Sequence, residues 1–341
     1  MRWTSSPRCG ANSVPVMVTG ASGFLGGRLA EVLAREGEQV TVLARPNADL
    51  RHLSASHVRV VRGSLTDRDS LLESVREATH IFHCAAASTD WASMEVYVES
   101  NVRGTEMLLA AAREARQLER FVHVSTTDVY GYPVIPCAET GALRDVGLPY
   151  NRTKILAEEA VWRAAREDGL PVTVVRPATI YGPRGKAFVT DIADLLRQGQ
   201  MAHIAGGRTT GGFLYVDNAV DAMMSAAQSP STLGQVYNLT DGTGVRWHEY
   251  VAALADGLGY KQPWINLSYG VAMAVASVME APYHLLKALP GRPLLTRHAV
   301  SLLGRDQEYP SEKARTEFGF LPQVSMAEGI ARSVAWLKTL S

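Results

Sequence analysis

The sequence predicts an α/β protein built on a doubly wound, mainly parallel sheet, because three features occur together. Short valine-rich runs alternate with longer amphipathic stretches through the first 180 residues, and this alternation is typical of βαβ units. A glycine-rich turn joins the first apolar run to the first amphipathic stretch. The chain also has 341 residues and is 46% hydrophobic, so it can bury a large core.

Six apolar runs are expected to form one sheet, and a seventh follows late in the chain. Their high valine content suits strands that are covered on both faces. The expected strands are Val14 to Thr19, Gln39 to Ala44, Val58 to Arg62, His80 to Cys84, Phe121 to Ser125, Val172 to Arg176 and Gln235 to Leu239. Helices are expected between them, for example over Gly27 to Glu36 and Thr105 to Arg116, where apolar residues recur every three or four positions.

Residues 1–13 are expected to be a loose leader, followed by two regions of different composition. Residues 14–182 should form mainly the sheet domain and residues 183–341 mainly a substrate-binding region, with strand 235–239 returning to the sheet. Glycine-rich turns introduce the second region, at Gly206, Gly207, Gly211 and Gly212. The uncharged run Gln262 to Met279 predicts a helix that is buried or covers a pocket. Attachment to a membrane surface is the alternative, since a spanning helix needs about 20 mostly apolar residues.

Charge and cysteine content exclude several classes of partner. The 34 Lys and Arg residues balance 34 Asp and Glu residues, so nothing favours nucleic acid or another polyanion as a ligand. The three cysteines, Cys9, Cys84 and Cys137, have no metal-ligand spacing and do not suggest a disulfide framework. We expect a cytoplasmic protein without a metal site.

The turn after the first strand has the spacing of a dinucleotide-binding loop. Gly20 permits a tight turn, Gly23 lets the backbone approach a pyrophosphate, and Gly26 allows the helix to pack closely on the strand. The helix that follows offers free amide donors to the phosphates. The residues between these glycines that are expected to contact the cofactor are Ser22, Phe24 and Leu25.

The ends of the next strands suggest which dinucleotide binds. An acidic residue after the second strand would bind the ribose hydroxyls of NAD, but this chain has Arg45, which could pair with the 2′-phosphate of NADP. NADP(H) is therefore favoured over NAD(H), with an exposed arginine that touches nothing as the alternative. Ser64 and Leu65 could flank the adenine, and Asp67 could cap the next helix. The fourth strand ends in small residues that suit either a nearby cofactor or tight packing, namely Ala85, Ala86 and Ala87.

Tyr150 and Lys154 are candidates for acid–base catalysis. They are four residues apart and so share one face of a helix. A phenol has a reference pKa of about 10, and a nearby ammonium favours its ionised form. Such a tyrosine can exchange a proton with a carbonyl or alcohol during hydride transfer. Hydroxyl groups of Ser125 and Thr126 end the fifth strand, where ligands bind in open α/β sheets.

Taken together, these motifs resemble the extended short-chain dehydrogenases/reductases over nearly the whole chain. The segments that carry the resemblance are 19–26, Asn101-Val102-Arg103-Gly104-Thr105, Ser125-Thr126-Thr127, Tyr150 with Lys154, and Arg176-Pro177-Ala178-Thr179-Ile180-Tyr181-Gly182-Pro183. The resemblance implies a Rossmann fold and a Tyr150 general acid/base. It also implies that Lys154 binds the nicotinamide ribose and lowers the pKa of the tyrosine. Thr126, or else Ser125, would polarise the substrate oxygen.

The same resemblance implies further roles outside the catalytic pair. Pro177 to Ile180 would lie against the nicotinamide. Asn101 would buttress the strand-end loops rather than contact the cofactor directly. Relatives often form homodimers through the helix after Asn101 and the helix that carries Tyr150, so a homodimer is expected.

The second region distinguishes between branches of that family. Sugar-nucleotide epimerases and dehydratases usually have a pyrophosphate-binding arginine where this chain has Gly211. The ending Val216-Asp217-Asn218 resembles the 3β-hydroxysteroid dehydrogenase branch instead, and Asp217 is expected to cap the following helix. The prediction is thus a ketone reductase or secondary alcohol dehydrogenase for a hydrophobic substrate, such as a steroid, a β-keto acyl compound or a polyketide.

Two alternatives differ from this prediction in function. The first is a sugar-nucleotide epimerase, dehydratase or reductase, in which Arg184, Arg208 or Arg246 would bind the pyrophosphate. The second is a non-catalytic NADP(H)-binding sensor. Such a sensor has no need of an acid and its tuning cation together, so Tyr150 and Lys154 favour an enzyme.

Overall fold

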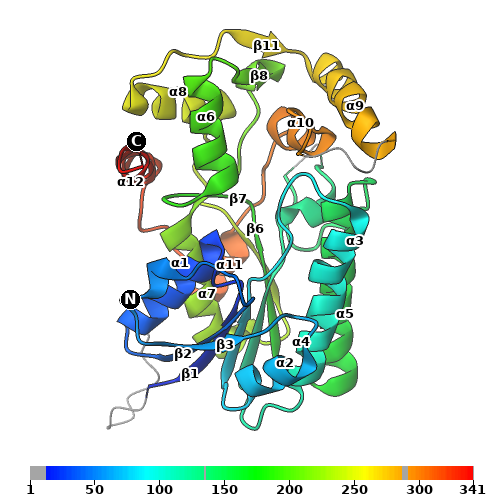
Figure 1. Cartoon of the computed structure of the whole chain (residues 1–341), viewed down its shortest axis with the longest axis vertical. Coiled ribbons are helices and arrows are strands. Elements are labelled where there is room, and N and C mark those ends of the chain that lie inside the picture. The colour runs from blue at the N-terminus through cyan, green and yellow to red at the C-terminus, as the bar shows by residue number, and fades with distance from the viewer. Residues whose placement is uncertain (1–12, 134–135, 286–290, 341) are drawn as a thin grey trace.

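The computed structural model describes residues 13–133, 136–285 and 291–340, so positions 1–12 of the expected leader lie outside it. Seven parallel strands form the central sheet in the order β10-β6-β5-β4-β1-β2-β3 (Figure 1). Their bounds are Pro15–Thr19 (β1), Gln39–Ala44 (β2), Val58–Arg62 (β3), His80–His83 (β4), Arg120–Val124 (β5), Val172–Pro177 (β6) and Val236–Leu239 (β10). The predicted Rossmann sheet is confirmed, and the late strand pairs with β6.

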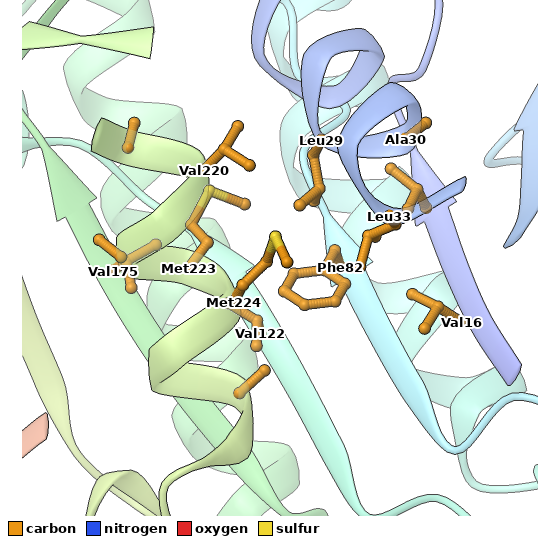
Figure 2. Close-up of a cluster of buried hydrophobic side chains, with 14 of the residues drawn as sticks. Val16, Leu29, Ala30, Leu33, Phe82, Val122, Val175, Val220, Met223 and Met224 are labelled. Atoms are coloured by element: carbon orange, nitrogen blue, oxygen red, sulfur yellow. The ribbon is translucent and has the colours of Figure 1, made fainter. Parts of the chain in front are cut away.

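Helices cover both faces of the sheet, as its apolar strands require. One face carries α1 (Phe24–Arg35), α7 (Val216–Gln228) and α11 (Glu312–Phe318), and the other carries α2 (Arg68–Val75), α3 (Met94–Tyr97), α4 (Gly104–Ala112) and α5 (Pro149–Asp168). Figure 2 shows the first of these layers, where Leu33 of α1, Met223 of α7 and Phe82 of β4 belong to one apolar cluster. All three side chains are fully buried. This packing fixes the carboxyl ends of the strands, where the candidate catalytic and cofactor residues were predicted to lie.

A second lobe lies above the sheet in Figure 1 and is formed mainly by the later part of the chain. We use this name for α6 (Asp191–Arg197), β8 (Ala202–Ile204), α8 (Trp247–Leu258), β11 (Ile265–Leu267), α9 (Tyr269–Leu285), α10 (Arg297–Gly304) and α12 (Met326–Lys338). A short parallel pair, β7 (Thr179–Tyr181) with β9 (Phe213–Tyr215), continues from the sheet towards it. The predicted glycine turns are present, with positive φ angles at Gly206, Gly207 and Gly212.

The expected apolar helix over residues 262–279 differs from the observed one. The chain first forms β11, and α9 then runs from Tyr269 to Leu285 and packs against α10. Only Ala272, Ala276 and Glu280 of α9 are buried, whereas Val278 is 73% exposed. The helix is therefore not buried, because only a narrow alanine stripe faces α10, and its role as the cover of a pocket stays a prediction. No helix in the described ranges is long and apolar enough to cross a membrane.

Two aspartates were expected to cap helices, and only one of them does. Asp67 accepts a hydrogen bond from the Asp69 N–H at 3.3 Å, which caps α2. Helix α7 begins at Val216, so Asp217 lies inside its first turn and the expected cap is wrong. Its carboxylate instead contacts Arg28 of α1 at 2.6 Å and Arg332 of α12 at 3.2 Å. Asp217 therefore joins three helices through ion pairs.

Candidate active site

The turn between β1 and α1 has the geometry of a dinucleotide cradle. Gly20 has a φ of +73°, and a Cβ atom there would lie 2.7 Å from the Ala85 nitrogen. A Cβ on Gly26 would lie 2.6 Å from the Gly20 oxygen, so neither position tolerates a side chain. No described side chain caps the first amides of α1, and Gly23 is exposed there. A helix start with open amides fits an anionic pyrophosphate.

The loop after β4 is held against this turn by two side chains. The Ala85 N–H donates to the Thr19 hydroxyl at 3.1 Å. The Ala87 N–H donates to Asn101 Oδ1 at 2.7 Å, and Asn101 Nδ2 donates back to the Ala87 oxygen at 3.3 Å. Asn101 lies in a π-helical turn between α3 and α4, a distortion often found near functional sites. The contacts agree with the expected buttressing role of Asn101.

Tyr150 and Lys154 lie on the first turns of α5, which begins with Pro149. The Lys154 ammonium donates to the Val124 oxygen at 2.7 Å, at the end of β5. Burial lowers the pKa of Lys154 to about 8, against the opposing charge of Glu158. This contact fixes the ammonium at the carboxyl edge of the sheet.

Asp128 and Thr126 have opposite effects on the pKa of the Tyr150 phenol. Burial and then the charge of Asp128 raise the pKa of Tyr150, while a hydrogen bond with the Thr126 hydroxyl opposes them. Lys154 therefore does not by itself produce a low pKa at Tyr150, and the expected tuning role of Lys154 stays a prediction. Tyr150 nevertheless lies with Thr126 at the carboxyl end of β5, where Lys154 of the same helix also contacts the strand.

Ser125 faces away from that pair. Its hydroxyl donates to Glu158 Oε2 at 2.6 Å, and Glu158 also accepts from Arg176 Nε at 3.0 Å and Trp162 Nε1 at 3.2 Å. Hydrogen bonds from Arg176, Ser125 and Trp162 lower the pKa of Glu158 despite its burial. Ser125 thus belongs to a buried ionic network behind the site, which makes Thr126 the better candidate for the substrate oxygen.

His298 and Asp128 reach this site, and sequence reasoning assigned neither of them a role. His298 Nε2 lies 2.8 Å from Asp128 Oδ2, although 170 positions separate the two residues. The imidazole also stacks on the Tyr150 ring, with centroids 5.6 Å apart and planes inclined by 26°. Asp128 directly follows the Ser125-Thr126-Thr127 segment, so it had a local signal. His298 had none, because only the docking of α10 brings it there.

The expected adenine end of the site contains a second arginine. Arg45 is exposed after β2, and the adjacent Arg62, at the end of β3, donates to the Arg45 oxygen at 3.1 Å. Ser64 is half-buried and its hydroxyl lies 3.1 Å from that of Thr66. Leu65 packs against the start of α4 at Gly104. The predicted contacts of Arg45, Ser64 and Leu65 with the cofactor stay predictions.

The other predicted cofactor residues lie at the same edge of the sheet. Pro177 is buried at the end of β6, and Ile180 in β7 is half-buried and pairs with Leu214. The remaining half-exposed or exposed positions at this edge are Ser22, Phe24, Leu25, Ala85, Ala86 and Ala87. The carboxyl ends of β1, β4, β5 and β6 thus bring the predicted residues to one side of the molecule.

The position of the sugar-nucleotide arginine is closed in this chain. A Cβ atom on Gly211 would lie 2.2 Å from the Phe213 ring, so an arginine there would displace that buried aromatic. Arg184 is already paired with Glu31 of α1 at 2.7 Å. Arg208 and Arg246 are exposed. The positions of Gly211 and of these three arginines therefore do not favour a binding site for the pyrophosphate of a sugar nucleotide.

Comparison with known proteins settles the family. A model of the "NAD dependent epimerase/dehydratase family" matches residues 16–240. The chain belongs to this family. It is 32% identical over 326 residues to the "2-alkyl-3-oxoalkanoate reductase" of Stenotrophomonas maltophilia, covering 93% of this chain and 97% of the relative. These matches confirm the predicted extended short-chain dehydrogenase/reductase.

Other relatives of the chain support the predicted 3β-hydroxysteroid dehydrogenase-like branch of the family. The chain is 34% identical to the "4-hydroxy-2-methyl-3-oxo-4-farnesyl-3,4-dihydroquinoline-1-oxide ketoreductase" of Stigmatella aurantiaca, over 92% of the chain and 93% of the relative. It is 26% identical to the "3beta-hydroxysteroid-dehydrogenase/decarboxylase isoform 1" of Arabidopsis thaliana, over 93% and 78%. The solved structure of gox2253 superposes with a TM-score of 0.80 at 26% identity, over 97% of this chain and 99% of that one. The predicted oxidoreductase class and branch are confirmed.

Proposed function

We propose that this family member is an NADPH-preferring ketoreductase that interconverts a hydrophobic β-oxo acyl compound and its 3-hydroxy form. The observation that carries the proposal is the placement of Tyr150 and Lys154 on the first turns of α5, where Lys154 donates to the Val124 oxygen at the end of β5 at 2.7 Å. Strands β5 and β1 flank β4, so this pair lies near the open start of α1. The names of the relatives from Stenotrophomonas maltophilia and Stigmatella aurantiaca both contain a 3-oxo group, which supports the substrate class.

The residues of the site can perform the proton part of this reaction. NADPH, when bound, supplies the hydride that reduces the carbonyl carbon. Tyr150 gives its phenolic proton to the carbonyl oxygen as that oxygen gains the electron pair of the broken C=O π bond. The Thr126 hydroxyl donates a hydrogen bond to the same oxygen. Lys154 uses one of its three protons on the Val124 oxygen, which leaves the others for the ribose hydroxyls.

The preference for NADPH is supported by the charges after β2 and β3. Arg45 and Arg62 lie side by side there, and guanidinium groups bind a phosphate through charge-assisted hydrogen bonds. Asp49, the nearest carboxylate along the chain, is paired with Arg51 at 2.6 Å. No carboxylate in strand β2 itself stands ready for the ribose hydroxyls of NAD.

The test is the oxidation of NADPH and of NADH by purified protein with a panel of ketones. The panel contains a 2-alkyl-3-oxoalkanoate, a 3-oxo steroid, a polyketide-like β-oxo ester and a sugar-nucleotide 4-ketone. We expect turnover with the β-oxo compounds, a preference for NADPH, and loss of turnover in Tyr150→Phe with NADPH binding retained. Turnover of the sugar nucleotide alone would favour a sugar-nucleotide epimerase, dehydratase or reductase. Tight NADPH binding without turnover of any ketone would favour the sensor.

A further inference from the structure

A histidine from the second lobe contacts both the catalytic tyrosine and its neighbouring aspartate. His298 lies at the start of α10, which in Figure 1 sits above the sheet beside α9. Its ring stacks on Tyr150 at 5.6 Å, and its Nε2 is 2.8 Å from Asp128 Oδ2. The side chains of His298 and Asp128 are only 13% and 8% exposed. The ion pair is therefore largely shielded from water, where charges interact strongly.

The residues next to His298 are anchored separately, so the position of its ring is fixed. The Thr296 hydroxyl donates to Asp90 Oδ2 at 3.0 Å and accepts from the Ala299 N–H at 3.0 Å, which caps α10. The Arg297 N–H and guanidinium donate to Glu280 of α9 at 2.7 and 2.6 Å. These neighbouring contacts hold the backbone of His298 in place, so its ring does not depend on the contact with Asp128 alone for its position.

The charges around His298 favour its protonated form. Burial opposes that form, but the hydrogen bond and charge of Asp128 raise the pKa of His298, with smaller contributions from Asp90 and Glu280. The ionisable groups that face the pair come from six parts of the chain. They are Asp90 (loop after β4), Asp128 and Tyr132 (segment after β5), Tyr150 (α5), Glu280 (α9), Arg297 (α10) and Tyr309 (segment before α11).

We infer that His298 is a positioning residue whose positive charge offsets the Asp128 carboxylate beside Tyr150, so that Tyr150 can lose and regain its proton during turnover. The inference rests on the acid–base role of Tyr150 in the proposed function. An unpaired Asp128 would oppose a phenolate on Tyr150, because two negative charges would then share a site of low dielectric. The second lobe thus supplies the positive charge that contacts Asp128 and stacks on Tyr150.

The test is a direct titration of Tyr150 in the protein saturated with NADP⁺. Ultraviolet tyrosinate difference spectra are recorded against pH, and the spectra of Tyr150→Phe are subtracted, so no substrate is needed. In His298→Asn the midpoint should rise by about one pH unit, the low end of the effect of one nearby charge. The double variant Asp128→Asn/His298→Asn should return to the wild-type midpoint, because both charges are then gone. Where a ketone substrate is found, the rate of alcohol oxidation should shift with pH in the same way.

Control variants separate charge from structure. Thr296→Val removes the anchor to Asp90 but neither charge of the pair, so it should lower the melting temperature and leave the midpoint in place. His298→Lys retains a cation and should keep the midpoint near that of the wild type, which also covers the case in which the asparagine variant fails to fold. An unchanged midpoint in folded His298→Asn, or a rise that the double variant does not reverse, overturns the inference. Failure of Tyr150→Phe to abolish turnover would instead overturn the proposed function.

Discussion

Replacing the two adjacent hydroxyls at the end of β5 separates catalysis from stability. Thr126→Val removes the hydroxyl that is predicted to bind the substrate oxygen and that accepts from the Asp128 N–H at 3.2 Å, and it keeps the shape of the side chain. Ser125→Ala removes the hydroxyl that donates to Glu158 at 2.6 Å. The two positions are consecutive and both side chains are buried, so each variant is the matched control of the other.

Thr126→Val and Ser125→Ala should affect different quantities, the first kcat and the second the free energy of unfolding. Loss of one donor to a developing oxyanion typically lowers kcat by about 10²–10³-fold, which we expect for Thr126→Val. A hydrogen bond to a charged group contributes about 1.5–3 kcal/mol to folding, which we expect Ser125→Ala to lose at most. Glu158 keeps its contacts with Arg176 and Trp162, so the kcat of that variant should stay close to the wild-type value.

The assay combines steady-state NADPH oxidation with unfolding in urea for each variant. Thr126→Ser, which retains the hydroxyl, should recover most of the kcat lost in Thr126→Val. The reasoning would be refuted if Ser125→Ala lost turnover at wild-type stability while Thr126→Val retained it. That result would mean that the Ser125 hydroxyl leaves Glu158 and turns towards the substrate.

Four further substitutions test other parts of the structure. Glu158→Ala should lower the free energy of unfolding by about 3–5 kcal/mol, because it leaves the buried Arg176 guanidinium without its anion; chemical denaturation measures this. Arg45→Ala should lower the kcat/KM for NADPH by about tenfold or more and leave that for NADH unchanged, and equal losses with both would exclude a phosphate contact. Asn101→Ala should weaken NADPH binding in a fluorescence titration, because it frees the Ala87 N–H and oxygen, whereas unchanged binding would limit Asn101 to folding. His123→Leu should stabilise the protein by about 1–3 kcal/mol at neutral pH, since neither ring nitrogen of His123 has a partner among the described residues.

The effect of His123→Leu should also depend on pH. Burial, and the charge of Lys154, lower the pKa of His123 well below its ordinary value in the folded protein. The unfolded chain binds a proton at this histidine below its reference pKa of about 6.5, and the folded protein does not. The wild type therefore loses stability as the pH falls below that value, by up to about 1.4 kcal/mol per pH unit from this residue. Melting curves from pH 7 to pH 5 should show the gap between variant and wild type widening, and a constant gap would contradict the argument.

Local sequence patterns predicted the sheet well because its strands are buried on both faces. Each of the seven expected strands was placed to within one residue at either end, since a valine-rich run bounded by glycine or polar residues leaves little freedom. The Gly20 to Gly26 turn was predictable for a similar reason, because close backbone contacts exclude side chains there. Helix α9 was placed less well, since its apolar residues stay largely exposed and composition alone does not show which face a helix buries.

The choice between Ser125 and Thr126 could not be made from the sequence, because it depends on which way adjacent side chains point from a strand end. Alternation along a strand sends neighbours to opposite sides. Ser125 is drawn to one side by Glu158, a residue of α5 that lies 33 positions later. Only the packing of α5 against β5 and β6 decides the question, and that packing is a tertiary property.

The contact of His298 with Tyr150 shows what the second lobe adds to the sheet. The loop after β4 carries Ala87, which lies at the cofactor edge, and also Asp90, which binds Thr296 and Arg292 of the later chain. A residue predicted to contact the dinucleotide and a residue that fixes α10 therefore share one short loop. Because each can bias the same loop, we expect dinucleotide binding and the position of α10 to be coupled, and such a coupling acts equally in both directions. A change at Asp90 removes a charge that favours protonated His298 as well as the contacts with Thr296 and Arg292, so it should affect the titration of Tyr150 as well as NADPH affinity. Thr296→Val keeps that charge and should leave the titration in place, and a change in the Gly20 turn should affect affinity first.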